Sequence, residues 1–305
     1  MPVLLSRYGL LKTRLDRFTR MLRGVQTCDV RALHRARVAS RRLREVLPVL
    51  QLEPSVAVEI VRRSRKVTRR LGHVRELDVL LLLIDDLQRS ERYDRESLDR
   101  VSAMLTEERD EARRQLTAKL PTGELNRLVT KLQKVATSLA KSDRTAAESR
   151  TATRALRWAV DARVERRAHA LRAAIERAGA LHLPDRLHAV RIALKKFRYA
   201  LELAGELRDD PNIVARLKTF KRNQDLLGRW HDRQVLIDRV RHAQASLTPP
   251  SVSSWSRLDT VVMGLENECR RLHGRYLREA AALLAVSDGV GSPSPRELAL
   301  KRSHR

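Results

Sequence analysis

Residues 33–44 read LHRARVASRRLR, and residues 187–198 read LHAVRIALKKFR. A second related pair follows, RRSRKVTRRLGHVRELDVL at 62–80 and KTFKRNQDLLGRWHDRQVL at 218–236. The two copies of the first stretch begin 154 residues apart, and the two copies of the second stretch begin 156 residues apart. A small insertion in a connecting loop accounts for this difference. A long segment copied in this order indicates an internal repeat, which predicts two similar helical bundles related by a pseudo-two-fold axis.

Apolar residues recur at helical spacing along nearly the whole chain, and no segment alternates with the two-residue period of a strand. We therefore predict an all-α fold. The expected helices cover residues 3–23, 30–50, 54–72, 74–89, 95–119, 123–140, 150–180, 185–207, 210–228, 230–246 and 254–285. They form one domain over 1–285, with a first repeat at 3–119, a connecting helix at 123–140, a second repeat at 150–285, and a disordered basic tail at 286–305.

A helical wheel separates the first repeated stretch into a core face and a cationic ridge. The core face is predicted to contain Leu33, Ala36, Leu43, Val46, Leu47 and Leu50. The ridge beside it, at spacing i, i+3, i+7 and i+10, is made of His34, Arg37, Arg41 and Arg44. The helix rises about 10 Å between positions 37 and 44, so a linear polyanion along the ridge meets three cations in succession.

The ridge recurs in the second copy, and each copy carries a second basic face. The matching ridge positions are His188, Arg191, Lys195 and Arg198. The second basic faces are Arg62, Arg65, Lys66 and Arg69 in the first copy and Lys218, Lys221 and Arg222 in the other. Segment 29–75 has a net charge of +9 and segment 185–233 a net charge of +5, so less than a third of the chain holds +14 of the total +26. Four such helices converging would line a groove with a focused positive potential.

The excess of cations predicts a polyanionic partner: a nucleic acid, an anionic membrane or a phosphate polymer. The longest apolar stretch, at 77–87, is too short to span a bilayer. Two widely separated cysteines give no disulfide framework, which favours the reducing cytoplasm. Three Trp, four Tyr and three Phe offer few of the stacking platforms that single-strand nucleic-acid binders use.

Catalytic motifs are not apparent in the sequence. Four carboxylates lie near the Leu-Gly dipeptides: Glu76, Asp78, Asp225 and Asp232. Their spacing does not direct several of them at one metal ion, so we expect them to pair with Arg75, Arg233 and neighbouring arginines. His34 and His188 have no HxxxH or Cys/His companions, and His73 and His231 are weaker candidates for the same anionic ligand. We therefore expect no enzyme, no cofactor and no metal site.

Four motifs in fixed order carry a resemblance to a known family: HxxRxxxRxLR at 34–44, LGxxRExDVL at 71–80, HxxRxxxKxFRYALEL at 188–203 and NQDLLGxxxD at 223–232. Together they resemble the CHAD family, the conserved histidine α-helical domain, over residues 1–285. The resemblance implies two helical bundles around a basic central groove or pore. It also implies non-enzymatic binding of inorganic polyphosphate by the ridge and face residues named above, and association with polyphosphate granules.

The chain departs from the family's usual residues at Arg75-Glu76 and His231-Asp232, which lie outside the basic faces. Two alternatives stay open at this level. A helical nucleic-acid-binding protein needs only phosphate contacts to hold a duplex. A metal-dependent phosphohydrolase would use the carboxylates near the Leu-Gly dipeptides as ligands.

Overall fold

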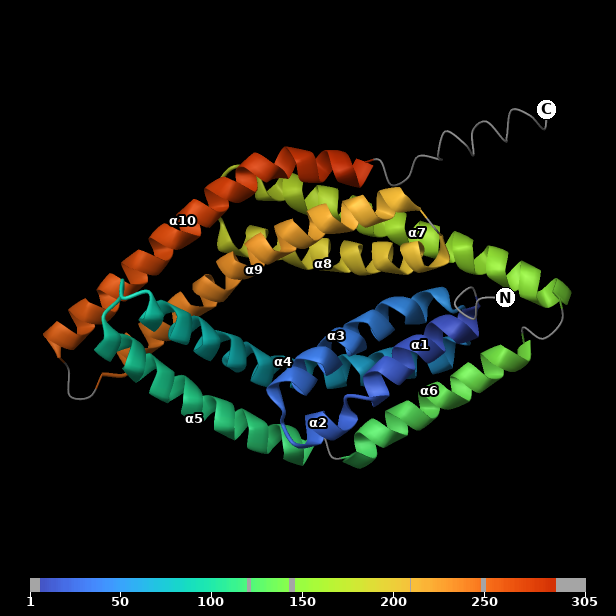
Figure 1. Cartoon of the computed structure of the whole chain (residues 1–305), viewed down its shortest axis with the longest axis horizontal. Helices are drawn as coiled ribbons and strands as arrows, with labels where there is room; N and C mark the ends of the chain where they lie inside the picture. Colours follow the sequence, from blue (N-terminus) through green and yellow to red (C-terminus); the bar gives the residue numbers. More distant parts are fainter. Residues whose placement is uncertain (1–5, 120–121, 143–145, 209, 248–250, 289–305) are drawn as a thin grey trace. The chain divides into compact units, whose positions relative to one another are not determined.

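The chain is described by a computed structural model over residues 6–119, 122–142, 146–208, 210–247 and 251–288. Within these ranges it forms helices and no strand, which confirms the all-α prediction (Figure 1). The helices are α1 (Arg7–Thr19), α2 (Leu22–Gln26), α3 (Val30–Val46), the 3-10 helix η2 (Leu47–Val49), α4 (Pro54–Arg89), α5 (Arg95–Lys119), α6 (Thr122–Ser142), α7 (Ala146–Ala178), α8 (Pro184–Leu207), α9 (Pro211–Ala245) and α10 (Val252–Asp288).

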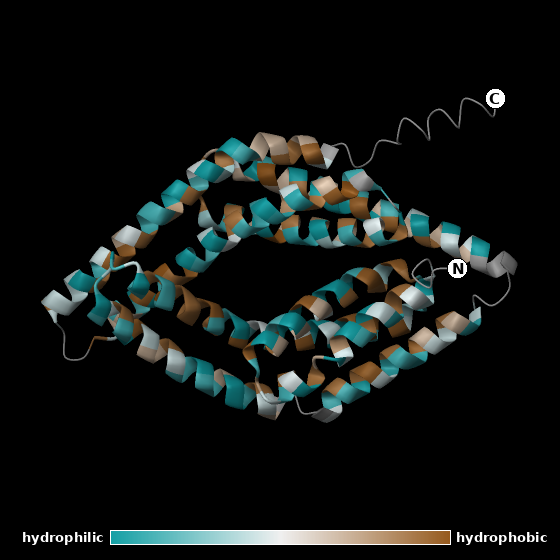
Figure 2. Ribbon diagram, in the orientation of Figure 1, coloured by the Kyte–Doolittle hydropathy of each residue, from teal (hydrophilic) through white to brown (hydrophobic). Residues whose placement is uncertain are grey.

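The first repeated stretch lies on α3, and its apolar arc is core. All six residues predicted for this arc are buried. Asp29 caps the helix, because its carboxylate accepts a hydrogen bond from the backbone N–H of Ala32 at 2.6 Å. The α-helix ends at Val46, earlier than predicted, and continues as η2, which keeps Leu47 and Leu50 in the core. Figure 2 shows the resulting alternation of apolar and polar residues along the helices.

The helix breaks predicted at the two Leu-Gly dipeptides are wrong. α4 runs without interruption through Gly72, and α9 runs through Gly228. A single glycine lowers helix stability by only about 1 kcal/mol, and neither segment contains a proline that would remove a backbone donor. Buried side chains on both sides of Gly72, including Leu71 and Val74, outweigh that cost.

Other helix ends also differ from the prediction. Residues 7–26 form two helices instead of one, because a turn at Arg20 and Met21 directs Leu22 and Val25 of α2 into the core. α8 begins at Pro184, whose fixed φ suits the first helical position, so Leu183 is the N-cap and Asp185 lies in the first turn. α10 ends at Asp288, three residues into the predicted tail, and residues 289–305 lie outside the described residues.

The chain divides into two compact units, Met1–Leu156 with Gly228–Leu272, and Arg157–Leu227 with His273–Arg305. In the first unit α1 packs against α3 and α6, α3 against α4, and α4 against α5. α2 approaches α3 closely at Gly24, where a Cβ atom would collide with the Cβ of Ala32. Glycine at this position therefore allows the tight α2–α3 turn that fixes α1 beside α3.

The second unit contains α8, most of α7, and parts of α9 and α10. Its core includes the rings of Phe197 and Phe220, which meet edge to face with centroids 4.9 Å apart and join α8 to α9. Arg208 at the end of α8 forms an ion pair with Asp161 of α7. The prediction that the two copies are related by a pseudo-two-fold axis, with the stated repeat boundaries, stays a prediction.

Candidate anion-binding site

The predicted ridge of the first copy lies along α3 beside the core face. The imidazole of His34 is exposed, and Arg37, Arg41 and Arg44 are half-buried. The guanidinium of Arg37 lies over α4 at Gly72, where a Cβ atom would be 3.5 Å from Nε and 3.6 Å from Nη2. Arg37 thus lies against α4, whereas His34 is open to solvent.

His34 lies in a positive field contributed by two helices. Partial desolvation lowers the pKa of His34, and the charges of Arg75 on α4 and of Arg37, Arg41 and Arg35 on α3 lower it further. Its imidazole is therefore neutral at pH 7 in the absence of a ligand. A neutral imidazole still donates one hydrogen bond, and an anion bound nearby would oppose the arginine charges and raise the pKa of His34.

The second basic face of the first copy is exposed on α4. Arg62, Arg65, Lys66 and Arg69 all reach solvent. Lys66 forms an ion pair with Glu124 of α6 at 2.9 Å, and Arg70 pairs with the other oxygen of the same carboxylate at 2.9 Å. Part of this face is therefore already neutralised by α6.

In the second copy the ridge residues are more deeply buried. His188 and Arg191 are half-buried, and Lys195 is only 8% exposed. Arg198 pairs with Glu202, donates a hydrogen bond to Gln224 at 2.8 Å and lies 5.0 Å from the centre of the Tyr199 ring. The contacts of Arg198 join α8 to α9, which gives this arginine a structural role.

The second basic face of that copy lies on α9 within the same unit. Lys218, Lys221 and Arg222 are exposed. Arg222 contacts Glu279 of α10 at 3.2 Å. The ridges of the two copies therefore differ in exposure: His34 is exposed and Arg41 half-buried, whereas His188 is half-buried and Lys195 is only 8% exposed.

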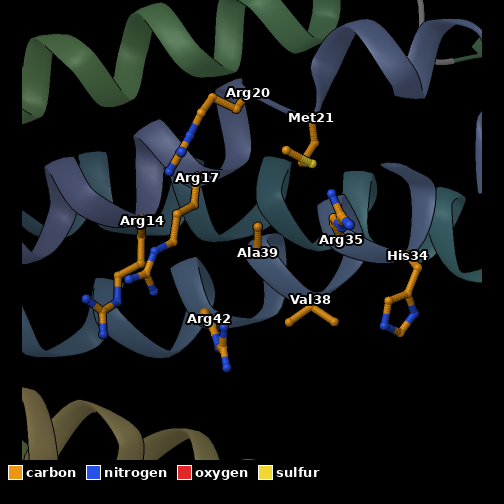
Figure 3. A pocket seen from close by; sticks show the side chains of 9 residues that line it. All are labelled: Arg14, Arg17, Arg20, Met21, His34, Arg35, Val38, Ala39 and Arg42. Atoms are coloured by element: carbon orange, nitrogen blue, oxygen red, sulfur yellow. The ribbon is translucent and has the colours of Figure 1, made fainter. Parts of the chain in front are cut away.

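A cavity of about 330 Å³ lies between α1 and α3. It is lined by Arg14, Arg17, Arg20, Met21, His34, Arg35, Val38, Ala39 and Arg42 (Figure 3). Five guanidinium groups and one imidazole from two adjacent helices therefore surround one space. Arg14 is only 4% exposed, so its charged group is held in place by the surrounding protein.

Only His34 of these lining residues belongs to the predicted ridge. The cavity follows a neighbouring face of α3, on which Arg35 and Arg42 are seven residues apart. Sequence reasoning also missed α1, where Arg14, Arg17 and Arg20 recur at a spacing of three. That spacing was a usable signal, but at the 154-residue offset of the repeat the matching positions are Ala168, Leu171 and Ala174, so the repeat does not point to it.

A second, more polar hollow of about 470 Å³ follows one face of α6. Its lining consists of Gly123, Asn126, Arg127, Thr130, Lys131 and Lys134. Lys131 pairs with Glu59 of α4, and Arg127 donates to the backbone carbonyl of Gly123 at 3.2 Å. This hollow is lined by residues of a single helix, so it is less enclosed by protein than the α1–α3 cavity.

The acidic residues near the Leu-Gly dipeptides do not converge. Asp78 is buried and contacts Arg113 of α5 at 3.3 Å, in place of the Arg75 pairing expected from sequence. Arg233 pairs with Glu268 of α10. Among the described residues, no three His, Cys, Asp or Glu side chains are grouped so that they could hold one metal ion.

None of the described helices combines the length and apolar character that a bilayer crossing requires. No curated protein matches the sequence. Among solved structures, the fold is similar to the crystal structure of the CHAD domain from the plant Ricinus communis. The TM-score is 0.61 at 21% sequence identity, and the match covers 94% of this chain and 90% of that chain. The sequence also matches the CHAD domain over residues 9–241, a range that contains both copies of the repeated segment. The chain therefore belongs to the CHAD domain family.

Proposed function

We propose that this protein binds inorganic polyphosphate without hydrolysing it, and that the α1–α3 cavity is the principal contact. One observation carries the proposal: five arginines from two packed helices surround a single space of about 330 Å³. A polyanion in this space would meet several guanidinium groups at once, and their combined positive potential would attract it. The α3 ridge begins at His34 on the rim of the cavity and extends the same cationic surface.

The residue types favour a phosphate chain as the ligand. A guanidinium group presents a planar set of donors that binds two phosphate oxygens at once. Polyphosphate has no bases to read or stack, so a site for it needs regularly spaced cations and few aromatic rings. The chain has ten aromatic residues and 63 Lys and Arg, a balance that suits this ligand. Membership of the CHAD domain family supports the same ligand.

Binding without catalysis is part of the proposal. Two carboxylates beside the basic helices are engaged with cations: Glu124 with Lys66 and Arg70, and Asp78 with Arg113. Burial opposes ionisation of Glu124, but Lys66 and Arg70 outweigh burial and lower the pKa of its carboxyl. These carboxylates neutralise arginine and lysine and are not directed at the α1–α3 cavity.

Competition binding tests the proposed ligand. A fluorescent DNA duplex bound to the protein at moderate salt is titrated with long-chain polyphosphate, with concentrations matched by charge. We expect polyphosphate to displace the duplex at less than one equivalent of charge. Failure to displace it would favour the nucleic-acid alternative. Incubation with polyphosphate and Mg²⁺ or Mn²⁺ should release no phosphate, and release that stops when Asp78 or Asp232 is replaced would identify a phosphohydrolase instead.

Two finer parts of the proposal concern the whole protein. We propose that the ridge of each copy adds contacts to the phosphate chain, and that the protein accumulates at polyphosphate granules in the cytoplasm. Fluorescence imaging of the tagged protein in cells with and without polyphosphate tests the second part. The expected result is foci that disappear when polyphosphate is absent.

A further inference from the structure

The α1–α3 cavity contains apolar side chains where a purely anionic ligand needs none. Three successive turns of α3 line it: His34 and Arg35, then Val38 and Ala39, then Arg42. Each turn lies about 6 Å along the helix axis from the previous one. The middle turn is apolar, and Met21, between α1 and α2, adds to it. All three apolar residues are partly exposed in the cavity.

Figure 3 shows how the charged and apolar groups are separated within the cavity. Arg14, Arg17 and Arg42 lie toward one end, and Arg35 and His34 lie toward the other. Val38, Ala39 and Met21 lie between these two groups. The cavity therefore offers a cationic end, an apolar centre and a second cationic end.

Inorganic polyphosphate gains nothing from an apolar surface, because every atom on its outside is a charged or bridging oxygen. A ligand that also carries a planar organic group would bury that group on the apolar centre and gain hydrophobic free energy. Guanidinium planes additionally stack on nucleobases. A cavity near 300 Å³ is within the range of small-molecule sites, at its lower end.

We propose that this cavity binds a nucleoside triphosphate, with the triphosphate at Arg14, Arg17 and Arg42 and the base against Met21, Val38 and Ala39. The inference rests on the proposed function, since it assigns the same arginines to phosphate. It adds a second class of ligand to the site, and it predicts that free nucleotide and polyphosphate compete for it. Arg35 stacks on the base or donates to its edge.

The test compares ATP with tripolyphosphate, which has the phosphate chain but no base. Isothermal titration calorimetry on the full chain at pH 7.5, without divalent cations, measures both dissociation constants. If the base uses the apolar centre, ATP binds about tenfold more tightly than tripolyphosphate. An ATP affinity equal to or weaker than that of tripolyphosphate overturns the inference.

A near-isosteric double variant, Met21→Gln with Val38→Thr, removes apolar character and keeps every cation. We expect it to weaken ATP binding about tenfold and to change tripolyphosphate binding less than twofold. The matched control is Val58→Thr, because Val58 is 69% exposed on α4 outside the cavity and should affect neither ligand. Equal weakening of both ligands by the double variant overturns the inference.

A charge variant separates this inference from the proposed function. Arg17→Ala should weaken ATP, tripolyphosphate and long-chain polyphosphate together, whereas Arg31→Ala, on an exposed position of α3 outside the cavity, should weaken none. If long-chain polyphosphate binds and ATP does not compete with it, the nucleotide inference fails and the proposed function stands. If ATP binds and long-chain polyphosphate does not, the proposed function fails and the nucleotide site stands.

Discussion

The salt dependence of polyphosphate binding reports directly on the cavity arginines. Each cation that neutralises a phosphate releases a condensed counterion, which contributes about −0.7 to the slope of log K against log salt for a single-stranded polyanion. The five arginines of the α1–α3 cavity therefore contribute about −3.5. Raising salt from about 50 to 200 mM should then weaken binding roughly 100-fold through the cavity alone.

Replacing Arg17 and Arg42 together by alanine should reduce the cavity's contribution to the slope of log K against log salt to about −2.1. The same increase in salt would then weaken binding through the cavity only about 20-fold. Fluorescence anisotropy with end-labelled long-chain polyphosphate, repeated at five or more salt concentrations, measures the slope. This double substitution removes one cavity arginine from α1 and one from α3.

Two matched variants give this experiment its controls. Arg23 and Arg31 are exposed on α2 and α3 outside the cavity, so their double alanine variant should keep the parent slope. Arg41 and Arg44 belong to the ridge, and their double variant measures what the ridge adds. An unchanged slope in the Arg17 and Arg42 variant, together with a reduced slope in the ridge variant, would refute the assignment of the cavity as the principal contact.

Four further predictions follow from the structure. Gly72→Ala should stabilise the fold by about 0.5–1 kcal/mol in urea unfolding, because α4 is continuous there and the new methyl group would make only ordinary contact with Arg37. Lys195→Glu should lower the melting temperature by several degrees, since Lys195 is 8% exposed, whereas Arg41→Glu should leave it nearly unchanged and weaken polyphosphate binding. Burial, and to a lesser extent the neighbouring arginines, lowers the pKa of His34 in the free protein, and phosphate bound beside it should raise that pKa. Affinity should therefore increase as pH falls from 8 to below 6.5, and His34→Gln should abolish that increase. Burial, and to a lesser extent His182, lowers the pKa of His273 in the folded state, so the unfolded chain takes up the proton first as pH falls. Thermal melts should therefore show stability decreasing below about pH 6.5, and the His273→Gln variant should show a flatter pH profile.

The helical fold was readable from the sequence because it depends on local periodicity. A 3.6-residue pattern places apolar residues on one face whatever the neighbouring helix is, so the six α3 core residues were identified without a structure. The same reasoning failed at Gly72 and Gly228. Whether a glycine ends a helix depends on burial of the residues around it, which a local pattern does not reveal.

The cationic character of α3 and α4 was also readable from the sequence, since charge counts and spacing need no tertiary information. Which cations share a space could not be read, because that depends on the partner helix. Arg14, Arg17 and Arg20 join Arg35 and Arg42 only because α1 packs beside α3. Likewise, Lys195 and Arg41 hold matching ridge positions in the two copies, yet packing leaves Lys195 only 8% exposed and Arg41 half-buried. The sequence by itself determined the helices and their charge, and the tertiary structure decided which arginines can hold one anion together, because convergence of side chains is a property of packed pairs of helices.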